Sequence, residues 1–421
     1  MTSLVTHRDG SALEPSAGEG HLAAALHRSA PHMAITSVEI DATLSWDHID
    51  LPLCNADFFE YTADQTQGYD VVFGNPPYVT LRNTEVETKE LLAPFVEAYQ
   101  GKVNLYQLFF DRCIDLLKPG GELVFIIPGE WVYATSATPL REKIQRCGAI
   151  TDFIHCGEEK LFSDASVPFI SIVRFVRDAV QGPVRFHNSF GAAHQKQSPE
   201  LRSLVIRENR WMMLPSALAD EIARWGTLRD QFSAHVGLVS GCDEVFALKS
   251  GSKVENECRL PQLTSERTVR DFLFLDRYNS LDEVPPRARA YVRRHKRRLL
   301  SRKIRAFSSE NFWQYGAVRN LPLMDSTSER FFALVKTRSH QPFFLASSVK
   351  HFTGAVLGIF RLENAALRCD EVVELMNSPR YRSVLESMLL VSGEKVSLQP
   401  ATLLDAPLPR TTADLRAFLA G

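Results

Sequence analysis

The stretch that decides the fold is residues 71–79, VVFGNPPYV. Its first three residues form an apolar run that predicts a buried strand, and the run ends at a glycine. The two prolines that follow cannot continue a sheet ladder, so Asn75 and Tyr78 lie where the chain leaves the strand. Ligands of open α/β sheets bind at the carboxyl ends of strands. We therefore predict a ligand site at residues 75–78.

Composition limits the class of protein. The chain has 421 residues, 45% of them hydrophobic, and a net charge of −2, which predicts two or three globular domains. Its seven cysteines form no CxxC or Cys/His cluster, so neither a metal site nor a disulfide framework is indicated, and free thiols favour the cytoplasm. Neither a signal pattern nor an apolar run of spanning length is present, so we expect no membrane association.

Three upstream segments carry polar residues after predicted strands. Residues 14–20, EPSAGEG, form a small-residue turn before an Ala/Leu-rich helix, and Gly18 lets the backbone approach a ligand closely. Glu39 follows the turn at the spacing of an acid that binds the ribose of an adenosine cofactor. Asp57 can accept from an adenine amino group, and Phe58 can cover the ring. The alternatives are a tight turn for the glycines and core packing for Phe58.

Seven predicted strands with crossover helices indicate a doubly wound α/β sheet. Beyond the segments above, apolar runs at 122–128, 150–155 and 167–176 supply strands. Residues 178–210 are polar and predict an irregular connection. Several strand ends should meet at one edge, and they carry Glu14, Gly18, Glu39, Asp57 and Asn75.

Taken together, EPSAGEG, VEID, NADFF, GNPPY, LLKPGGELVFIIP and LFSDASVPFISIVRF resemble, in this order, one known catalytic domain. It is that of the gamma-class, TaqI-type adenine-N6 DNA methyltransferases of restriction–modification systems. The resemblance covers nearly all of the first half. It implies a seven-stranded class I methyltransferase sheet that binds S-adenosylmethionine and methylates an adenine flipped out of duplex DNA.

The resemblance also implies residue roles. The turn would face the methionine part of the cofactor, and the other positions its ribose and adenine; the cofactor-binding residues are Glu14, Pro15, Ser16, Ala17, Gly18, Gly20, Glu39, Ile40, Asp57 and Phe58. The target amine would meet the Asn75 side chain and the Pro76 carbonyl, and two rings would stack on the target base; the catalytic residues are Asn75, Pro76, Pro77, Tyr78 and Phe162.

The resemblance is incomplete at the N-terminus, and two alternatives stay open. The family has a helix before the first strand whose Thr-Pro start touches the cofactor, whereas ten residues precede Ser11 here and none matches. One alternative is therefore a catalytically weakened, methyltransferase-like DNA-binding or specificity protein. The other is methylation of RNA or of a protein glutamine, because such enzymes also use an NPP-aromatic motif. Those usually carry an Asp-x-Gly-x-Gly turn, which residues 14–18 lack, and they lack a large C-terminal domain.

We expect the catalytic domain at 1–210 and a mixed α+β DNA-recognition domain at 211–421. Residues 228–248 and the closing VSLQPATLLDAPLP resemble the recognition domain of the same family. Residues 285–305 hold ten Lys/Arg and no acid, which suits DNA phosphates, although a solvated helix face is the alternative. The aromatic residues of NFWQY at 311–315 are interpreted as core, with contact to DNA bases or sugars as the alternative. The candidate DNA-binding residues are Arg293, Arg294, Lys296, Arg297, Arg298, Arg302 and Lys303.

The expected partners follow from these assignments. The chain shows no PD…ExK nuclease pattern, so a cognate restriction endonuclease would be a separate chain. We expect the protein to act on double-stranded DNA as a monomer, with S-adenosylmethionine as its cofactor and without a metal.

Overall fold

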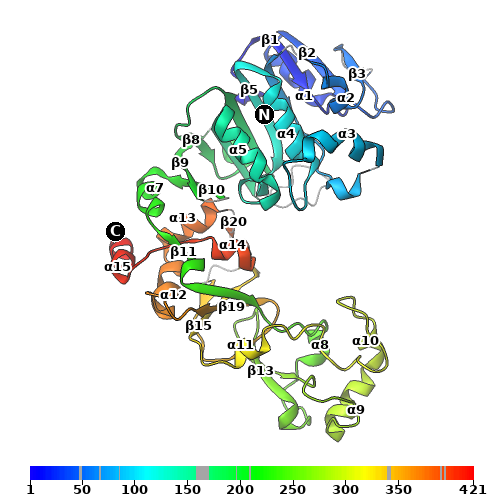
Figure 1. Cartoon of the computed structure of the whole chain (residues 1–421), viewed down its shortest axis with the longest axis vertical. Helices are drawn as coiled ribbons and strands as arrows, with labels where there is room; N and C mark the ends of the chain where they lie inside the picture. The colour runs from blue at the N-terminus through cyan, green and yellow to red at the C-terminus, as the bar shows by residue number, and fades with distance from the viewer. Residues whose placement is uncertain are drawn as a thin grey trace. The chain divides into compact units, whose positions relative to one another are not determined.

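The computed structural model describes residues 1–46, 50–65, 68–84, 86–157, 170–195, 197–207, 210–338, 343–388, 391–392 and 395–421. Contacts divide the chain into two units, formed mainly by Met1–Ala223 and Arg224–Glu386 (Figure 1). The predicted boundary after residue 210 falls inside a strand, Arg210–Pro215, so the first unit extends further than predicted.

The first unit is built on one sheet, to which the described residues contribute ten strands. In chain order these are β1 (Asp9–Glu14), β2 (His32–Glu39), β3 (Leu53–Asn55), β4 (Tyr69–Gly74), β5 (Leu117–Pro128), β6 (Gly148–Gly157), β7 (Ile170–Arg177), β8 (Val184–His187), β9 (Glu200–Arg207) and β10 (Arg210–Pro215). Their spatial order is β10-β9-β8-β6-β7-β5-β4-β1-β2-β3. The pairs β3–β2, β2–β1, β1–β4 and β4–β5 are parallel, and β7 runs antiparallel to both of its neighbours.

Helices cover both faces of this sheet. They are η1 (Thr2–Leu4), α1 (His21–Ser29), α2 (Phe58–Thr62), η2 (Leu81–Asn83), α3 (Val86–Val96), α4 (Leu105–Asp115), η3 (Gly129–Val132), η4 (Thr135–Ala137), α5 (Thr138–Cys147), α6 (Phe190–His194) and α7 (Ser216–Ala223). Adjacent residues of a strand point to opposite faces. Ala12 of β1 packs in the same apolar cluster as residues of α1, whereas Leu13 packs in the cluster that contains residues of α4 and α5. The predicted doubly wound arrangement is therefore confirmed.

The strand count and the connection at 178–210 are corrections. The prediction of seven strands omits β8, β9 and β10, which extend the sheet beyond β6. Residues 178–210 are not an irregular connection, because β8 pairs in parallel with β6 and antiparallel with β9. The alternation in β8, where Val184 and Phe186 are buried and Arg185 is exposed, is a strand pattern in the midst of a polar segment.

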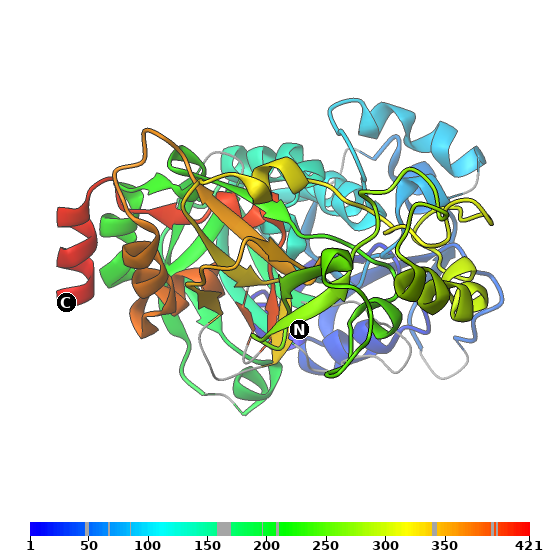
Figure 2. The ribbon, with the colours of Figure 1, turned by 90° about the horizontal axis from the view of Figure 1, so that it is seen from below.

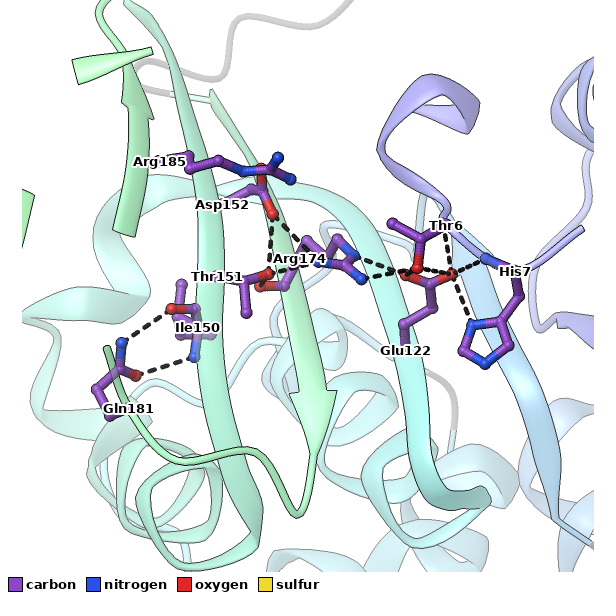
Figure 3. A network of polar contacts seen from close by, with 9 residues as sticks. All are labelled: Thr6, His7, Glu122, Ile150, Thr151, Asp152, Arg174, Gln181 and Arg185. Carbon is purple, nitrogen blue, oxygen red and sulfur yellow. Dashed lines mark hydrogen bonds and ion pairs between the residues drawn. The ribbon is translucent and has the colours of Figure 1, made fainter. Parts of the chain in front are cut away.

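A buried charge network ties three strands of the sheet to the N-terminal segment (Figure 3). Glu122 of β5 accepts from the backbone N–H groups of Thr6 at 2.7 Å and of His7 at 2.8 Å. Arg174 of β7 pairs with Glu122 at 2.6 Å and with Asp152 of β6 at 3.4 Å. Burial alone would raise the pKa of Glu122, but the His7 hydrogen bonds and the Arg174 charge lower it overall.

In the second unit the described residues form several small sheets and short helices. The sheets have the orders β12-β19-β15-β17, β14-β13-β18, β16-β21-β20 and β11-β22. The strands are β11 (Gly226–Thr227), β12 (Phe232–Val236), β13 (Arg259–Leu263), β14 (Val269–Leu273), β15 (Arg330–Leu334), β16 (Lys336–Arg338), β17 (Phe344–Leu345), β18 (His351–Phe352), β19 (Val356–Arg361), β20 (Val391–Ser392), β21 (Lys395–Ser397) and β22 (Pro407–Leu408).

The helices of this unit are η5 (Leu228–Asp230), α8 (Asp243–Phe246), η6 (Asn256–Cys258), α9 (Pro286–Arg294), α10 (Lys296–Leu300), α11 (Leu321–Asp325), α12 (Cys369–Asn377), α13 (Pro379–Ser387), α14 (Pro400–Leu404) and α15 (Thr412–Ala420). The terminal helix α15 packs beside α12 (Figure 2). Phe312, Trp313 and Tyr315 are each 1% exposed, which confirms that the NFWQY segment belongs to the core.

Candidate active site

The strands β1, β2, β3 and β4 pair in parallel, so the four predicted motifs that follow them lie at one edge of the sheet. β2 pairs with β1 up to Glu14 and with β3 up to Asn55. The residues that leave these strands therefore emerge side by side, as predicted. A Cβ on Gly74 would lie only 3.3 Å from Cδ of Pro15, so the turn after β1 packs directly against the segment that leaves β4.

A cavity of about 540 Å³ opens at this edge. Nine predicted site residues line it: Pro15, Ser16, Gly18, Glu39, Ile40, Asp57, Phe58, Asn75 and Pro77. Its volume suits a small-molecule ligand, because such sites typically measure about 300–1,000 Å³.

A second cavity, of about 490 Å³, lies against the same turn. It is lined by Glu14, Ala17, Met1 and Phe190 among others, and it shares Ser16, Gly18 and Asn75 with the first cavity. These three residues therefore form a wall common to both cavities.

The turn and the end of β2 hold each other in place. Gly18 has a φ of +55°, and its N–H donates to Oε2 of Glu39 at 2.7 Å. Gly20, with a φ of +75°, is the N-cap of α1. Both glycines lie in the left-handed region that other residues rarely adopt. The turn that contains Gly18 and Gly20 thus contacts the Glu39 carboxylate and leads directly into α1.

Asp57 and Phe58 have structural roles as well as positions in the first cavity. Oδ1 of Asp57 caps α2 by accepting from the N–H groups of Phe59 at 2.8 Å and Glu60 at 3.3 Å. Phe58 is 3% exposed, and its ring stacks on Phe109 at 4.8 Å between centroids. Phe58 therefore packs in the core and also forms part of the cavity wall.

The motif after β4 is held at both of its ends. The Asn75 carbonyl accepts from Ser16 Oγ at 3.1 Å, whereas its side-chain Oδ1 is buried without a hydrogen-bond partner among the described residues. Tyr78 donates to the Ile126 carbonyl at 2.7 Å and meets Tyr106 edge to face. Burial raises the pKa of the Tyr78 hydroxyl, which therefore stays protonated. Neither Pro76 nor Tyr78 lines either of these two cavities.

One predicted site residue lies outside the described residues, and two residues that line the cavities were not predicted. Phe162, the predicted second stacking ring, lies outside the described residues. Phe109 of α4 lines the first cavity, but its helical spacing indicates only a core residue. Phe190 of α6 lines the second cavity from the segment that was expected to be irregular.

The cations of the basic segment at residues 285–305 differ in whether they already contact other groups of the protein. Arg302 is a correction to the predicted DNA-binding set, because it is 8% exposed and donates to the carbonyls of Ser240, Phe312, Gln314 and Leu299 at 2.6–2.9 Å. Burial lowers the pKa of this guanidinium to about 10.

The other predicted phosphate ligands differ in whether they contact another side chain of the protein. Arg293 pairs with Asp282 at 3.5 Å, Arg298 pairs with Glu244, and Lys296 lies over the Phe312 ring. In the described part of the chain, no acid pairs with the remaining exposed cations, which are Arg294, Arg297 and Lys303.

The described residues lack a metal-binding cluster and a membrane-spanning helix. None of them forms a group of three or more His, Cys, Asp or Glu side chains that could hold a metal ion. Their helices include none that is long and apolar enough to cross a membrane.

Comparisons with known proteins point to one class of relative. The family model described as Eco57I restriction-modification methylase matches residues 36–162. The type II methyltransferase M.HindII of Haemophilus influenzae is 24% identical over 99% of this chain and 88% of its own length. This chain is similar to that methyltransferase from end to end. M.TthHB8I of Thermus thermophilus is 27% identical over 48% of this chain and 49% of its own length.

A solved structure gives the same fold. The type IIL restriction-modification enzyme MmeI, in complex with DNA, matches 97% of this chain and 64% of its own chain with a TM-score of 0.58 and 11% identity. At that identity the match describes the fold alone.

Proposed function

We propose that this chain is a site-specific DNA methyltransferase that transfers a methyl group from S-adenosylmethionine to N6 of an adenine in duplex DNA. The observation that carries the proposal is the Asn75 Oδ1 atom, a buried acceptor without a described partner where the two cavities meet. A buried acceptor left unsatisfied costs about 1–3 kcal/mol, which an amine donor from a ligand recovers. Similarity to M.HindII and M.TthHB8I supports methyl transfer as the reaction.

The first cavity fits the adenosine part of S-adenosylmethionine. Oδ1 of Asp57 caps α2, and no described residue donates to its Oδ2, which leaves that oxygen for the adenine amino group. Glu39 already accepts from the Gly18 and Asp41 N–H groups, but a carboxylate offers further lone pairs to ribose hydroxyls. Phe58 and Ile40 supply apolar surface for the ring.

The chain's own residues would activate a weak nucleophile. The lone pair of an adenine amino group is delocalised into the ring, so the amine must be held with its hydrogens out of the ring plane. Asn75 Oδ1 and the Pro76 carbonyl are two acceptors that can hold those hydrogens. When bound, S-adenosylmethionine supplies an electrophilic methyl group. Asn75 and the Pro76 carbonyl would hold N6 in place while the methyl group passes from sulfur to nitrogen, and N6 would then lose one proton to water. Positioning and electrostatics supply the rate.

We expect Tyr78→Ala to weaken capture of the target base about 5- to 100-fold, because base–aromatic stacking contributes about 1–3 kcal/mol. The variant Tyr78→Phe loses the hydrogen bond to the Ile126 carbonyl but keeps the aromatic ring. It should therefore weaken base capture less than Tyr78→Ala does. The fluorescence of 2-aminopurine at the target position measures capture. Equal capture by the alanine variant would remove Tyr78 from the site, and calorimetry with S-adenosylmethionine provides the control for cofactor binding.

We expect the exposed cations Arg294 of α9, Arg297 of α10 and Lys303, which lies beyond the end of α10, to bind DNA phosphates. The triple variant Arg294→Gln, Arg297→Gln, Lys303→Gln should lower the slope of log K against log salt by about 2 to 3, since each contact contributes about 0.9. Arg416→Gln, an exposed cation on α15, is the matched control and should leave the slope unchanged. An unchanged slope in the triple variant would show that this segment is a solvated face.

The substrate class is tested with radiolabelled S-adenosylmethionine. We expect label in duplex DNA, and not in RNA or protein supplied at the same concentration. Label in RNA or protein alone would overturn the DNA assignment. DNA binding without S-adenosylmethionine binding in calorimetry would favour the catalytically weakened specificity protein instead.

A further inference from the structure

A third cavity, of about 510 Å³, lies in the second unit between α8 and the end of α10 (Figure 1). Two short segments of the chain form its wall, and most of their side chains are polar. The lining residues are Gly241, Cys242, Asp243, Glu244, Arg298, Ser301, Arg302 and Lys303. None of them lines either cavity of the first unit. The polar lining indicates a ligand that is recognised by hydrogen bonds.

The buried Arg302 fixes the two walls of this cavity to each other. Its guanidinium donates to the Ser240 carbonyl at 2.6 Å, next to the first segment, and to the Leu299 carbonyl at 2.8 Å, next to Arg298. Leu299 is itself fully buried, which anchors the end of α10 in the core. Gly241 has a φ of +76°, and a Cβ there would lie 3.3 Å from Cδ of Arg302. The shape of the cavity is therefore set by the protein's own contacts.

Glu244 and Arg298 come from opposite walls and form an ion pair between Oε1 and Nη2. The thiol of Cys242 also donates to Oε1 of Glu244 at 3.6 Å. The side chains of Glu244 and Arg298 are 57% and 64% exposed, and ion pairs at that exposure contribute little to stability. The pair instead holds a hydrogen-bond acceptor and a planar fork of donors side by side at the surface.

The carboxylates in the lining indicate which part of a DNA duplex fits here. Asp243 and Glu244 repel a phosphate group, whereas the exocyclic amino group of a base requires an acceptor. In the major groove, a G·C pair presents adjacent acceptors, O6 and N7 of guanine, and a donor, N4 of cytosine. An arginine fork matches the guanine acceptors, and a glutamate matches the cytosine donor. An A·T pair has no adjacent acceptors on one base, so it does not match the fork.

Exposed cations near the cavity suit the phosphates on either side of such a base pair. Lys303 lines the cavity, and Arg294 and Arg297 belong to α9 and α10. Contacts to phosphates position a protein on DNA, whereas contacts to base edges determine which sequence it binds. The segment therefore supplies groups for both kinds of contact.

We propose that Glu244 and Arg298 together recognise one G·C base pair in the major groove of the DNA that this protein binds. Arg298 donates to O6 and N7 of guanine, and Glu244 accepts from N4 of cytosine. The inference rests on the proposed function, because it takes duplex DNA as the substrate from there. It also changes the role expected for Arg298, from a phosphate ligand to a residue that contacts a base.

Selection of bound DNA from a library of randomised duplexes tests the proposal without requiring methyl transfer. The full chain should enrich one sequence that contains a G·C pair. Arg298→Ala and Glu244→Ala should each lose the base preference at one and the same position, and keep it elsewhere. On the selected sequence, each variant should bind about 5- to 150-fold more weakly, the usual discrimination from a contact of this kind. Melting curves report whether the variants fold.

A modified guanine tests the same contact in the wild-type protein. 7-Deazaguanine lacks the N7 acceptor, so at one guanine of the selected sequence it should weaken wild-type binding at least about fivefold. This guanine should be the one whose preference Arg298→Ala loses, and the modification should not weaken that variant further. Wild-type binding that tolerates 7-deazaguanine at every position would contradict the proposal.

Asp282→Ala is the matched control. Asp282 forms exposed ion pairs with Arg289 and Arg293 in the same unit, and it lines none of the three cavities. The control should therefore select the same sequence as the wild type.

The outcomes distinguish this inference from the proposed function. An unchanged sequence preference in both variants, or equally weakened binding to every sequence, would overturn base recognition and leave methyl transfer intact. Failure of the wild type to select any sequence would also overturn it. If the wild type in addition left DNA unmethylated, the proposed function would fall as well.

Discussion

Asn75→Ala is expected to lower the rate of methyl transfer by at least about 10²–10³-fold, the usual loss when one preorganised polar group of an active site is removed. The side-chain oxygen is buried at the end of β4 and has no described partner, so a ligand amine is the donor that it awaits. Alanine would leave the Pro76 carbonyl as the one remaining acceptor. The amine would then stay planar, with its lone pair delocalised into the ring.

Single-turnover assays with saturating cofactor measure this effect on the chemical step. Binding of S-adenosylmethionine should change little, because Glu39, Asp57 and Phe58 remain. Asn188→Ala, an exposed amide in the same unit that lines neither cavity, is the matched control and should keep full activity. Wild-type rates in Asn75→Ala would remove this residue from the reaction.

Arg174→Met is expected to lower the free energy of unfolding by about 3–5 kcal/mol, because it removes the cation that two buried acids share. The Glu122 side chain is 0% exposed and that of Asp152 5%, and Arg174 contacts both (Figure 3). Arg185→Met is the control, because Arg185 pairs with the same Asp152 at 2.6 Å, but its side chain is 48% exposed. We expect about 0–1 kcal/mol there.

Urea unfolding at several pH values tests the network. The pKa of Glu122 is lower in the folded than in the unfolded protein, so its stabilisation is present above the unfolded value of 4.5 and is lost as pH falls below it. The difference between wild type and Arg174→Met should therefore shrink in acid. Equal stabilities at pH 7 would mean that the network contributes nothing.

The fold of the first unit was predictable where strands are apolar and their ends are marked by Gly or Pro. The run before Asn75 and the turn at residues 14–20 show this, because parallel pairing alone then brings the ends together. β8 and β9 were not, because the segment is polar: the exposed Arg185 lies between the buried residues of β8, and a buried residue of β9 is itself an arginine, Arg202. Pairing of β8 with β6, and of β9 with β8, decides their structure.

Side-chain environments are the part that sequence reasoning could not supply. Arg302 belongs to a run of cations that suits phosphate, and only tertiary contacts turn it inward onto four carbonyls. Likewise, the residues 14–20 indicate a ligand turn, but nothing local shows that Oε2 of Glu14 is buried without a partner among the described residues. The surroundings of this side chain include Ala23 of α1 and Gly74 of β4, which lie elsewhere in the sequence.

The most direct test of the central claim is modified-base sequencing of duplex DNA after incubation with the protein and S-adenosylmethionine. We expect N6-methyladenine within one recurring sequence, and none with Asn75→Ala. Methylation of cytosine, or unmodified DNA despite measured S-adenosylmethionine binding and DNA binding, would contradict it.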